Sequence, residues 1–314
     1  IKVNYDIYDT SEIVDTKLLA GRSGYDVVFH GASFASRLLS IGVFQPLDKS
    51  KLSNWGNLDP IKLEAIEEFD PGNRFGMPYM WGTTGVTYNA DMIEARLPNA
   101  PVDSYDLIFD PAVISKFSDC GVSFLDDPTS VVPMGMIYLG HPFNSVEPEH
   151  LEAVEELFTA VRPYIKYFSS SKLTIDLPSR EVCIAMSWSG DYAVAITRAR
   201  EVGIDLNLKY AIPAEGGIGW YDMVFIPADA SHSDNAHLFL NYLLRPNVIA
   251  TVTNYIGYAN ANQAANPLII PEYYSDVAIY PDDETFQSLE ITHILEPTLE
   301  RRRSRTWTRI KSGL

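Results

Sequence analysis

Segments with a strand-like pattern and segments with a helix-like pattern alternate along this chain, and this alternation limits its possible folds more than any other feature. Period-two alternation of apolar residues predicts a strand, and apolar residues recurring every three or four positions predict a helix. The predicted elements include a strand at 1–8, a helix at 13–19, a strand at 25–29, and helices at 151–161 and 234–244. We expect Asp9-Thr10-Ser11 to cap the first helix and Gly21 to end it. Strands that alternate with helices indicate an α/β fold with a mainly parallel sheet.

The length of the chain favours two domains over one, because 314 residues exceed the usual size of a single hydrophobic core. Two extended stretches, 80–89 and 219–227, carry glycines among β-branched and aromatic residues. Such stretches are candidates for hinge connections between domains. Strands inside one sheet remain equally possible for both stretches from the pattern alone.

Two short segments each place an indole close to a carboxylate: Trp188-Ser189-Gly190-Asp191 and Trp220-Tyr221-Asp222. An aromatic face attracts a cation, and a carboxylate accepts its N–H donors in charge-assisted hydrogen bonds. For either segment alone, a core tryptophan beside a turn aspartate is an equally good interpretation. Because both segments follow an apolar stretch, where a strand delivers its last residues to a cleft, we expect an ammonium-binding site.

The charge of the chain excludes several partners: 24 Lys and Arg against 41 Asp and Glu give a net charge of −17. A nucleic acid or an anionic membrane surface would be repelled, whereas a cationic ligand would be attracted. The longest apolar runs, such as 131–139, are too short to cross a bilayer. Cys120 and Cys183 are the two cysteines, and their spacing matches no zinc motif. They form either a disulfide or two buried free thiols.

Several longer runs resemble the bacterial periplasmic putrescine- and spermidine-binding proteins. They are 42–52, 77–85, 120–126, 241–246, 258–262 and 307–313. The resemblance extends in order over essentially the whole chain, and it is strongest to the putrescine-binding branch. It implies an α/β fold of two lobes, the type II periplasmic binding protein, in which two crossing strands join mixed, mainly parallel sheets flanked by helices. The implied lobe boundaries are 1–87 with 221–264 for lobe 1, and 88–220 with 265–314 for lobe 2.

The same resemblance implies a function, a location and partners. The chain would capture a polyamine (putrescine or spermidine) in the periplasm by hinge closure and deliver it to the membrane permease subunits of an ABC importer. It would act as a monomer, without cofactor, metal, catalytic residue or nucleic acid. The resemblance also implies a disulfide between Cys120 and Cys183.

Ligand contacts are implied residue by residue, and they divide between the lobes. Those implied as ring or carboxylate contacts are Trp188 and Asp191 in one lobe, and Trp220, Asp222 and Tyr258 in the other. Ser33 corresponds to a pocket-wall residue at the start of a helix.

Three departures bear on which polyamine is preferred. Ser130 stands where the putrescine branch has a glutamate, and Asp127 stands where the spermidine branch has an acidic contact; Trp220 also resembles the spermidine branch. An alternative role for Asp127 is the N-cap of a helix that begins at Pro128. The family's first strand and its Trp-Ser/Thr-Asp-Tyr motif do not occur in this sequence, so we expect these rings to be only part of the family's ring set.

Alternative functions are a polyamine-sensing receptor domain and an enzyme acting on a cationic amine. The sequence contains no G-x-S-x-G elbow, P-loop or G-x-G-x-x-G fingerprint. The six histidines lie mostly in polar contexts, which is typical of surface residues. Sugar or iron ligands, which related two-lobe proteins bind, fit the doubled aromatic–aspartate pattern less well than an amine.

Overall fold

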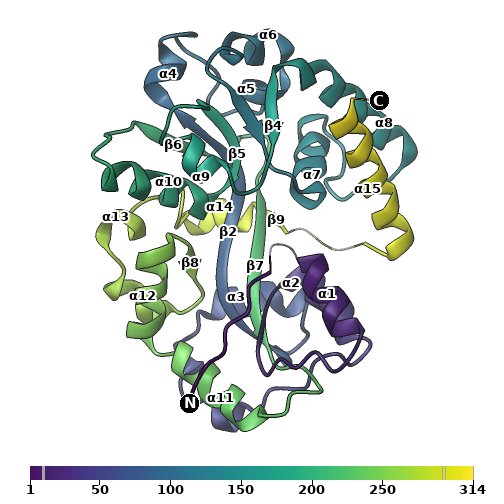
Figure 1. Ribbon diagram of the computed structural model, residues 1–314, viewed down its shortest axis with the longest axis vertical. Helices are drawn as coiled ribbons and strands as arrows, with labels where there is room; N and C mark the ends of the chain where they lie inside the picture. Colours follow the sequence, from purple (N-terminus) through teal and green to yellow (C-terminus); the bar gives the residue numbers. More distant parts are fainter. Residues whose placement is uncertain (9–10, 292, 294, 314) are drawn as a thin grey trace. The chain divides into compact units, whose positions relative to one another are not determined.

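Two long strands, β2 (Gly76–Asn89) and β7 (Ile218–Phe225), pass through the division of the chain into two units (Figure 1). The computed structural model describes residues 1–8, 11–291, 293 and 295–313. Unit 1 comprises Ile1–Trp81 and Trp220–Tyr274, and unit 2 comprises Gly82–Gly219 and Ser275–Leu314. Each of the two strands therefore contributes residues to both units. The expected lobe boundaries lie within about ten residues of these divisions.

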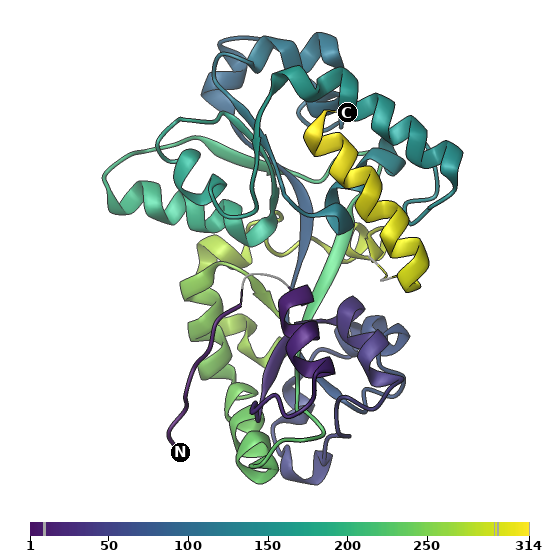
Figure 2. The ribbon, with the colours of Figure 1, turned by 45° about the vertical axis from the view of Figure 1, so that its right-hand side comes forward.

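In unit 1, β1 (Val28–Gly31) pairs antiparallel with β7, and β8 (Ala259–Asn260) pairs antiparallel with β2. Its helices are α1 (Ser11–Leu19), α2 (Ala32–Leu39), α3 (Pro60–Ala65), α11 (Ser233–Leu243), α12 (Pro246–Ile256) and α13 (Pro271–Tyr274) (Figure 2). Leu52, Met77, Val224 and Leu240 pack in a core between the strands and α11. Because Val224 of β7 belongs to this core, the core also holds the part of the strand that carries Asp222.

In unit 2, β5 (Ile184–Trp188) and β6 (Leu208–Ala211) pair antiparallel with β2. The parallel pairs are β3 (Val122–Phe124) with β5 and with β4 (Ile165–Phe168), and the start of β7 with β9 (Glu290–Ile291). The helices are α4 (Ala90–Glu94), α5 (Asp106–Phe109), α6 (Pro111–Ile114), α7 (Pro128–Tyr138), α8 (Pro148–Val161), α9 (Leu173–Asp176), α10 (Ser189–Glu201), α14 (Asp283–Gln287) and α15 (Pro297–Ser312). Phe109, Phe124 and Phe158 meet edge to face at the centre of the core.

Short 3₁₀ turns complete the two units. They are Lys49–Lys51, Trp55–Asn57, Ile66–Glu68, Ser115–Phe117, Arg162–Tyr164 and Gln263–Leu268. In the described part of the chain, every helix is too short or too polar to cross a membrane.

The α/β class and the predicted helices are confirmed, with α1, α8 and α11 beginning within three residues of their expected starts. Gly21, at φ +70°, follows α1 as predicted, whereas the expected cap at Asp9 and Thr10 lies outside the described residues. The sheet is mixed. The long strands β2 and β7 pair antiparallel with β5, β6, β8 and β1, so parallel pairing covers less of the sheet than the alternation indicated.

The strand predicted at 1–8 is wrong, because these residues adopt neither helix nor strand. Its alternating apolar side chains Ile1, Val3, Tyr5 and Ile7 are 57–80% exposed. Alternation predicts a strand only where one face is covered and the backbone has a pairing partner. Among the described residues, this segment meets neither condition.

A disulfide joins Cys120 to Cys183, with their Cα atoms 5.5 Å apart. It links the chain just before β3 to the chain just before β5, its partner in a parallel pair. Gly121, between the cysteine and β3, has φ +85°, and a Cβ there would lie 2.7 Å from the carbonyl oxygen of Glu181. The predicted pairing of the two cysteines is therefore present.

Candidate functional site

Asp222 lies in the unit 1 part of β7, directly across the antiparallel ladder from Gly31, the last residue of β1. Its Oδ1 atom lies 3.9 Å from the position that a Cβ of Gly31 would occupy, so the missing side chain leaves room beside the carboxylate. Burial raises the pKa of Asp222 to about 6, and the positive charge of His30 acts in the opposite direction. A carboxylate that is partly removed from water gains more from a bound cation than one on the surface.

Two aromatic rings of unit 1 lie near this carboxylate. Trp220 precedes Asp222 by two residues in β7, so their side chains share one face of the strand. The rings of Trp220 and Tyr258 meet edge to face, with centroids 5.5 Å apart and planes at 62°. In the part of the chain that the structure describes, the buried Trp220 Nε1 has no hydrogen-bond partner. The ring pair can offer both an aromatic face and one N–H donor to a ligand.

Ser33 is the second residue of α2, the helix that follows β1 without a loop. Its backbone carbonyl accepts a hydrogen bond from Ser36 Oγ at 2.7 Å. In the ladder between β1 and β7, Gly31 pairs with Asp222, and Ser33 follows Gly31 by two residues. Unit 1 therefore brings Ser33, Trp220, Asp222 and Tyr258 into one region.

In unit 2, Trp188 ends β5, and Asp191 is the third residue of α10, which follows at once. A carboxylate in the first turn interacts favourably with the positive end of the helix dipole. Burial raises the pKa of Tyr210, and the negative charge of Asp191 adds to this effect. The Tyr210 hydroxyl lies 2.8 Å from Thr83 Oγ1. Asp191 and Trp188 thus form a second carboxylate–indole set on the β5–α10 junction.

Asp127 is the N-cap of α7, the alternative that the sequence left open. Its Oδ1 accepts hydrogen bonds from the Thr129 backbone N–H at 2.9 Å and from Thr129 Oγ1 at 2.7 Å. Its Oδ2 accepts one from Ser130 Oγ at 2.6 Å. Ser130 is therefore bonded to the same carboxylate that the resemblance implied as a ligand contact. Whether Asp127 also meets a ligand stays a prediction.

Sequence reasoning missed a buried histidine one residue before Gly31, the ladder partner of Asp222. His30 in β1 is 1% exposed, and its Nε2 atom lies 2.7 Å from Asp15 Oδ1. The expectation that most histidines lie at the surface does not hold for His30 or for His237, which is 2% exposed. The sequence did contain a signal for the burial of His30, because this residue directly follows the apolar run 27–29 and so continues a buried strand.

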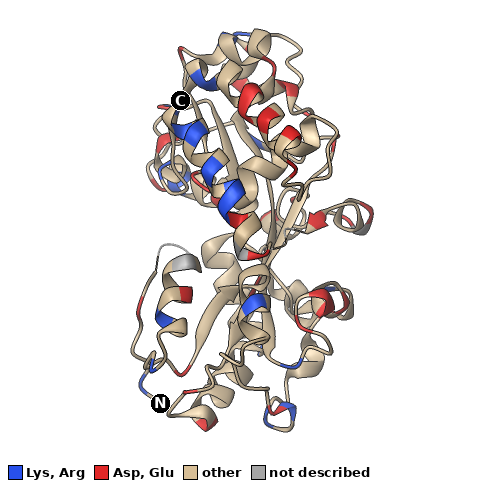
Figure 3. Cartoon of the chain, turned by 90° about the vertical axis from the view of Figure 1, so that its right-hand side faces the viewer, with Lys and Arg blue, Asp and Glu red and all other residues tan. Residues whose placement is uncertain are grey.

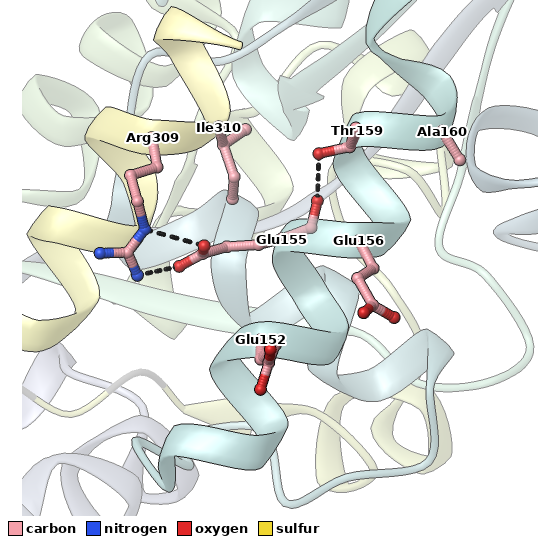
Figure 4. A pocket seen from close by; sticks show the side chains of 7 residues that line it. All are labelled: Glu152, Glu155, Glu156, Thr159, Ala160, Arg309 and Ile310. Atoms are coloured by element: carbon pink, nitrogen blue, oxygen red, sulfur yellow. Dashed lines mark hydrogen bonds and ion pairs between the residues drawn. The ribbon is translucent and has the colours of Figure 1, made fainter. Parts of the chain in front are cut away.

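A surface hollow of about 430 Å³ between α8 and α15 contains none of the predicted residues (Figure 4). Basic residues recur along α15 in Figure 3, and Arg309 donates to Glu155 from Nε at 2.8 Å. Glu152 and Glu156 complete the acidic wall. The residues that line this hollow include carboxylates but no aromatic ring, unlike the carboxylate–indole sets at Asp222 and Asp191. No cluster of three metal-ligating side chains occurs among the residues described.

Residues 1–281 match the family of bacterial extracellular solute-binding proteins, and the chain belongs to that family. Within it, the chain is 45% identical to the putrescine-binding periplasmic protein SpuD of Pseudomonas aeruginosa, covering 100% of this chain and 86% of that protein. It is also 45% identical to the putrescine-binding periplasmic protein PotF of Escherichia coli, covering 100% and 85%.

Among solved structures, a putative spermidine/putrescine ABC transporter from Listeria monocytogenes matches with a TM-score of 0.87 and 28% identity, covering 99% of this chain and 91% of that one. The spermidine/putrescine substrate-binding protein PotD of Streptococcus pneumoniae matches with a TM-score of 0.83 and 27% identity, covering 99% and 91%. These matches confirm the predicted type II periplasmic binding protein fold.

Proposed function

We propose that this protein is a periplasmic polyamine-binding protein that captures putrescine or spermidine and delivers it to the permease of an ABC importer. The observation that carries the proposal is that each unit of a solute-binding protein holds one carboxylate beside aromatic rings: Asp222 with Trp220 and Tyr258, and Asp191 with Trp188. The relatives that are named for putrescine and the periplasm support the ligand class and the location.

The chemistry of the two sets suits a slender ligand with an ammonium group at each end. Desolvating such a ligand is unfavourable unless both charges find a carboxylate. We propose that Asp222 takes one ammonium and Asp191 the other, with the indoles stacked on the methylene chain. Charge-assisted hydrogen bonds contribute about 1.5–3 kcal/mol each, and cation–π contacts add about 0.5–2 kcal/mol. After ordering costs, these contacts are enough for roughly micromolar affinity, about 8 kcal/mol.

Ligand contacts from both units would also provide the switch for delivery. A ligand that meets both carboxylates stabilises the state in which both are engaged, and this differential affinity is what hinge closure requires. A ligand with one charged end would engage a single carboxylate. It would therefore bind more weakly and favour closure less.

The preferred polyamine depends on the region of Asp127 and Ser130. The resemblance to the putrescine branch supports a diamine, whereas Asp127 and Trp220 support a triamine. Because Thr129 and Ser130 already donate to Asp127, a third ammonium would have to compete with these hydrogen bonds. We therefore propose putrescine as the preferred ligand.

Calorimetric titration with putrescine, cadaverine, spermidine and agmatine tests the proposal. We expect one ligand per chain, with putrescine bound most tightly, and mass spectrometry should recover the ligand unchanged after prolonged incubation. A Ser130→Ala variant should change the ratio of spermidine to putrescine affinity more than a His232→Gln control does. Absence of binding to all four amines, or conversion of the amine to a product, contradicts the proposal.

A further inference from the structure

One exposed surface of unit 1 contains no charged side chain. Residues 246–271 include no Asp, Glu, Lys, Arg or His, and this is the longest such run in a chain with a net charge of −17. The run comprises α12, β8, the 3₁₀ turn at 263–268 and the first residue of α13. Arg245 precedes it and Glu272 follows it. We call the exposed residues of this run the neutral face.

Burial does not explain why the neutral face lacks charges. The next longest run without a charged residue, 75–90, consists mainly of the buried strand β2. Charged side chains prefer the surface, and they make up 21% of the residues of this chain, so an exposed surface without them needs another reason. Nine residues of 246–271 are exposed: Asn247, Thr251, Tyr255, Gln263, Ala264, Pro267, Leu268, Ile270 and Pro271.

Hydrogen bonds bring the apolar part of the neutral face together. The side chain of Asn254 in α12 donates to the Leu268 carbonyl at 3.1 Å and accepts from the Ile270 N–H at 2.9 Å. Tyr255 follows Asn254 in the helix, and the Ile270 carbonyl accepts from the N–H of Tyr274 in α13 at 3.1 Å. Tyr255 is 86% exposed, and Leu268, Ile270 and Tyr274 are 37–50% exposed. Single exposed apolar residues are normal, whereas a cluster of them indicates an interaction site.

The charge of the chain limits which partner the neutral face fits. An anionic membrane surface repels a protein with a net charge of −17. The permease of the proposed function is embedded in such a surface, so a face without carboxylates can approach it against less repulsion than an acidic face. The centres of protein–protein interfaces are also enriched in aromatic residues and depleted of charged ones. Both properties favour a protein partner in the membrane.

The size of the neutral face favours a transient complex over a stable dimer. A standard interface uses roughly 20–30 residues on each side, whereas nine residues of the run are exposed. Two copies of this acidic chain would also repel each other. A binding protein that delivers its ligand must leave the permease afterwards, and a small interface allows this.

We infer that the neutral face of unit 1 is a docking surface for the periplasmic side of the permease. The inference rests on the proposed function, which supplies this partner. Tyr255 is the most exposed large side chain of the face, and a tyrosine buried by a partner contributes both contact area and a hydroxyl that can hydrogen-bond. The exposed residues of the face belong to neither carboxylate–indole set. Docking and ligand binding should therefore respond to different substitutions.

The test separates delivery from ligand binding with a Tyr255→Asp variant, introduced at the native locus of the source organism. We expect uptake of radiolabelled putrescine to fall about tenfold or more, as for an interface hot spot, with calorimetric putrescine affinity of the purified variant within about twofold of wild type. Tyr255→Phe keeps the ring and should retain most of the uptake. Ile41→Asp is the matched control, because Ile41 is also apolar, 61% exposed and in unit 1, but lies outside the run.

A second variant, Leu268→Asp, keeps the inference falsifiable if Tyr255→Asp accumulates poorly. Wild-type uptake with both variants would overturn the inference. An equal loss of uptake with Ile41→Asp would also overturn it, because added charge anywhere on unit 1 would then be the cause. Analytical ultracentrifugation of the wild-type protein should show a monomer. A dimer that Tyr255→Asp dissociates would assign the neutral face to a second copy of this chain and overturn docking to the permease.

Failure of the inference can be distinguished from failure of the proposed function by deleting the gene. If the deletion leaves putrescine uptake unchanged, or if the purified wild-type protein does not bind putrescine, the proposed function fails. If the deletion abolishes uptake while Tyr255→Asp and Leu268→Asp restore it to the wild-type rate, only the docking surface is refuted.

Discussion

Replacing Asp222 by asparagine should weaken ligand binding and stabilise the ligand-free protein. Burial raises the pKa of Asp222 from 3.8 to about 6, which is a shift of about two units. At about 1.4 kcal/mol per unit, the ionised carboxylate destabilises the fold at pH 7 by up to about 3 kcal/mol relative to the neutral form. Because the side chain keeps some solvent exposure, we expect about 1–3 kcal/mol. Asparagine has nearly the same shape but no charge to desolvate.

The pH dependence gives this prediction its sign. A carboxyl group whose pKa is raised by folding stabilises the fold below its unfolded pKa, near 3.8, and this stability is lost as the pH rises through about 6. The difference in melting temperature between Asp222→Asn and wild type should therefore be smallest near pH 4 and reach a plateau above pH 7. At roughly 2–4 °C per kcal/mol, the plateau should lie about 2–12 °C above wild type.

Binding should change in the opposite direction. Loss of a charge-assisted hydrogen bond to an ammonium, about 1.5–3 kcal/mol, lowers putrescine affinity by roughly 10- to 150-fold. The assays are differential scanning fluorimetry from pH 4 to 8 without ligand, and calorimetric titration with putrescine at pH 7.5.

Asp234→Asn is the matched control. Asp234 is also in unit 1, but it is exposed, and its hydrogen bond with Lys51 lowers its pKa. Its replacement should slightly lower the melting temperature and leave affinity unchanged. An Asp222→Asn variant that melts at or below the wild-type temperature at pH 7.5 would refute the argument from burial, and unchanged affinity would refute the ligand contact.

Three further predictions concern other parts of the molecule. Putrescine affinity of the wild-type protein should fall by about tenfold between pH 7.5 and pH 5, because a group with a pKa of about 6 is roughly one-tenth ionised at pH 5; a flat profile would contradict this. Replacing Cys120 and Cys183 by serine opens a loop with a sequence separation of 63 and should lower the free energy of unfolding by about 4 kcal/mol, measured by urea unfolding. As the control, wild-type protein reduced with dithiothreitol should lose an equal free energy of unfolding. A Cβ at Gly85 would lie 2.3 Å from the Ala211 carbonyl oxygen, so Gly85→Ala should lower stability by about 1–3 kcal/mol. Gly56→Ala, with no heavy atom within 4 Å of its Cβ, should be nearly neutral; equal effects at both positions would count against the packing argument.

Local patterns predicted the elements well wherever packing supplied the expected surroundings. The helix at 148–161 buries Leu151, Val154 and Phe158 on one face, which is the spacing that predicted it. The same reasoning failed at residues 1–8. A strand needs a pairing partner and a covered face, and neither requirement is encoded in the segment itself.

The candidate site was only partly predictable, for a similar reason. The two indole–carboxylate segments could be recognised because their residues are close in sequence, and the resemblance added Tyr258. The sequence pattern could not show that Tyr258 meets Trp220, or that Thr129 and Ser130 both donate to Asp127. These contacts depend on how a strand and a helix start are packed.

The sequence by itself determined the α/β class, the acidic charge that favours a cationic ligand, and the chemistry of the residues offered to it. Only the tertiary structure decided that the carboxylate of Asp222 is largely removed from water. It also decided that His30, one residue before the ladder partner of Asp222, is buried. The reason is that ionisation depends on burial and on charges brought together by the fold. Gly31 and Asp222 are far apart in sequence, yet the ladder between β1 and β7 makes them direct neighbours.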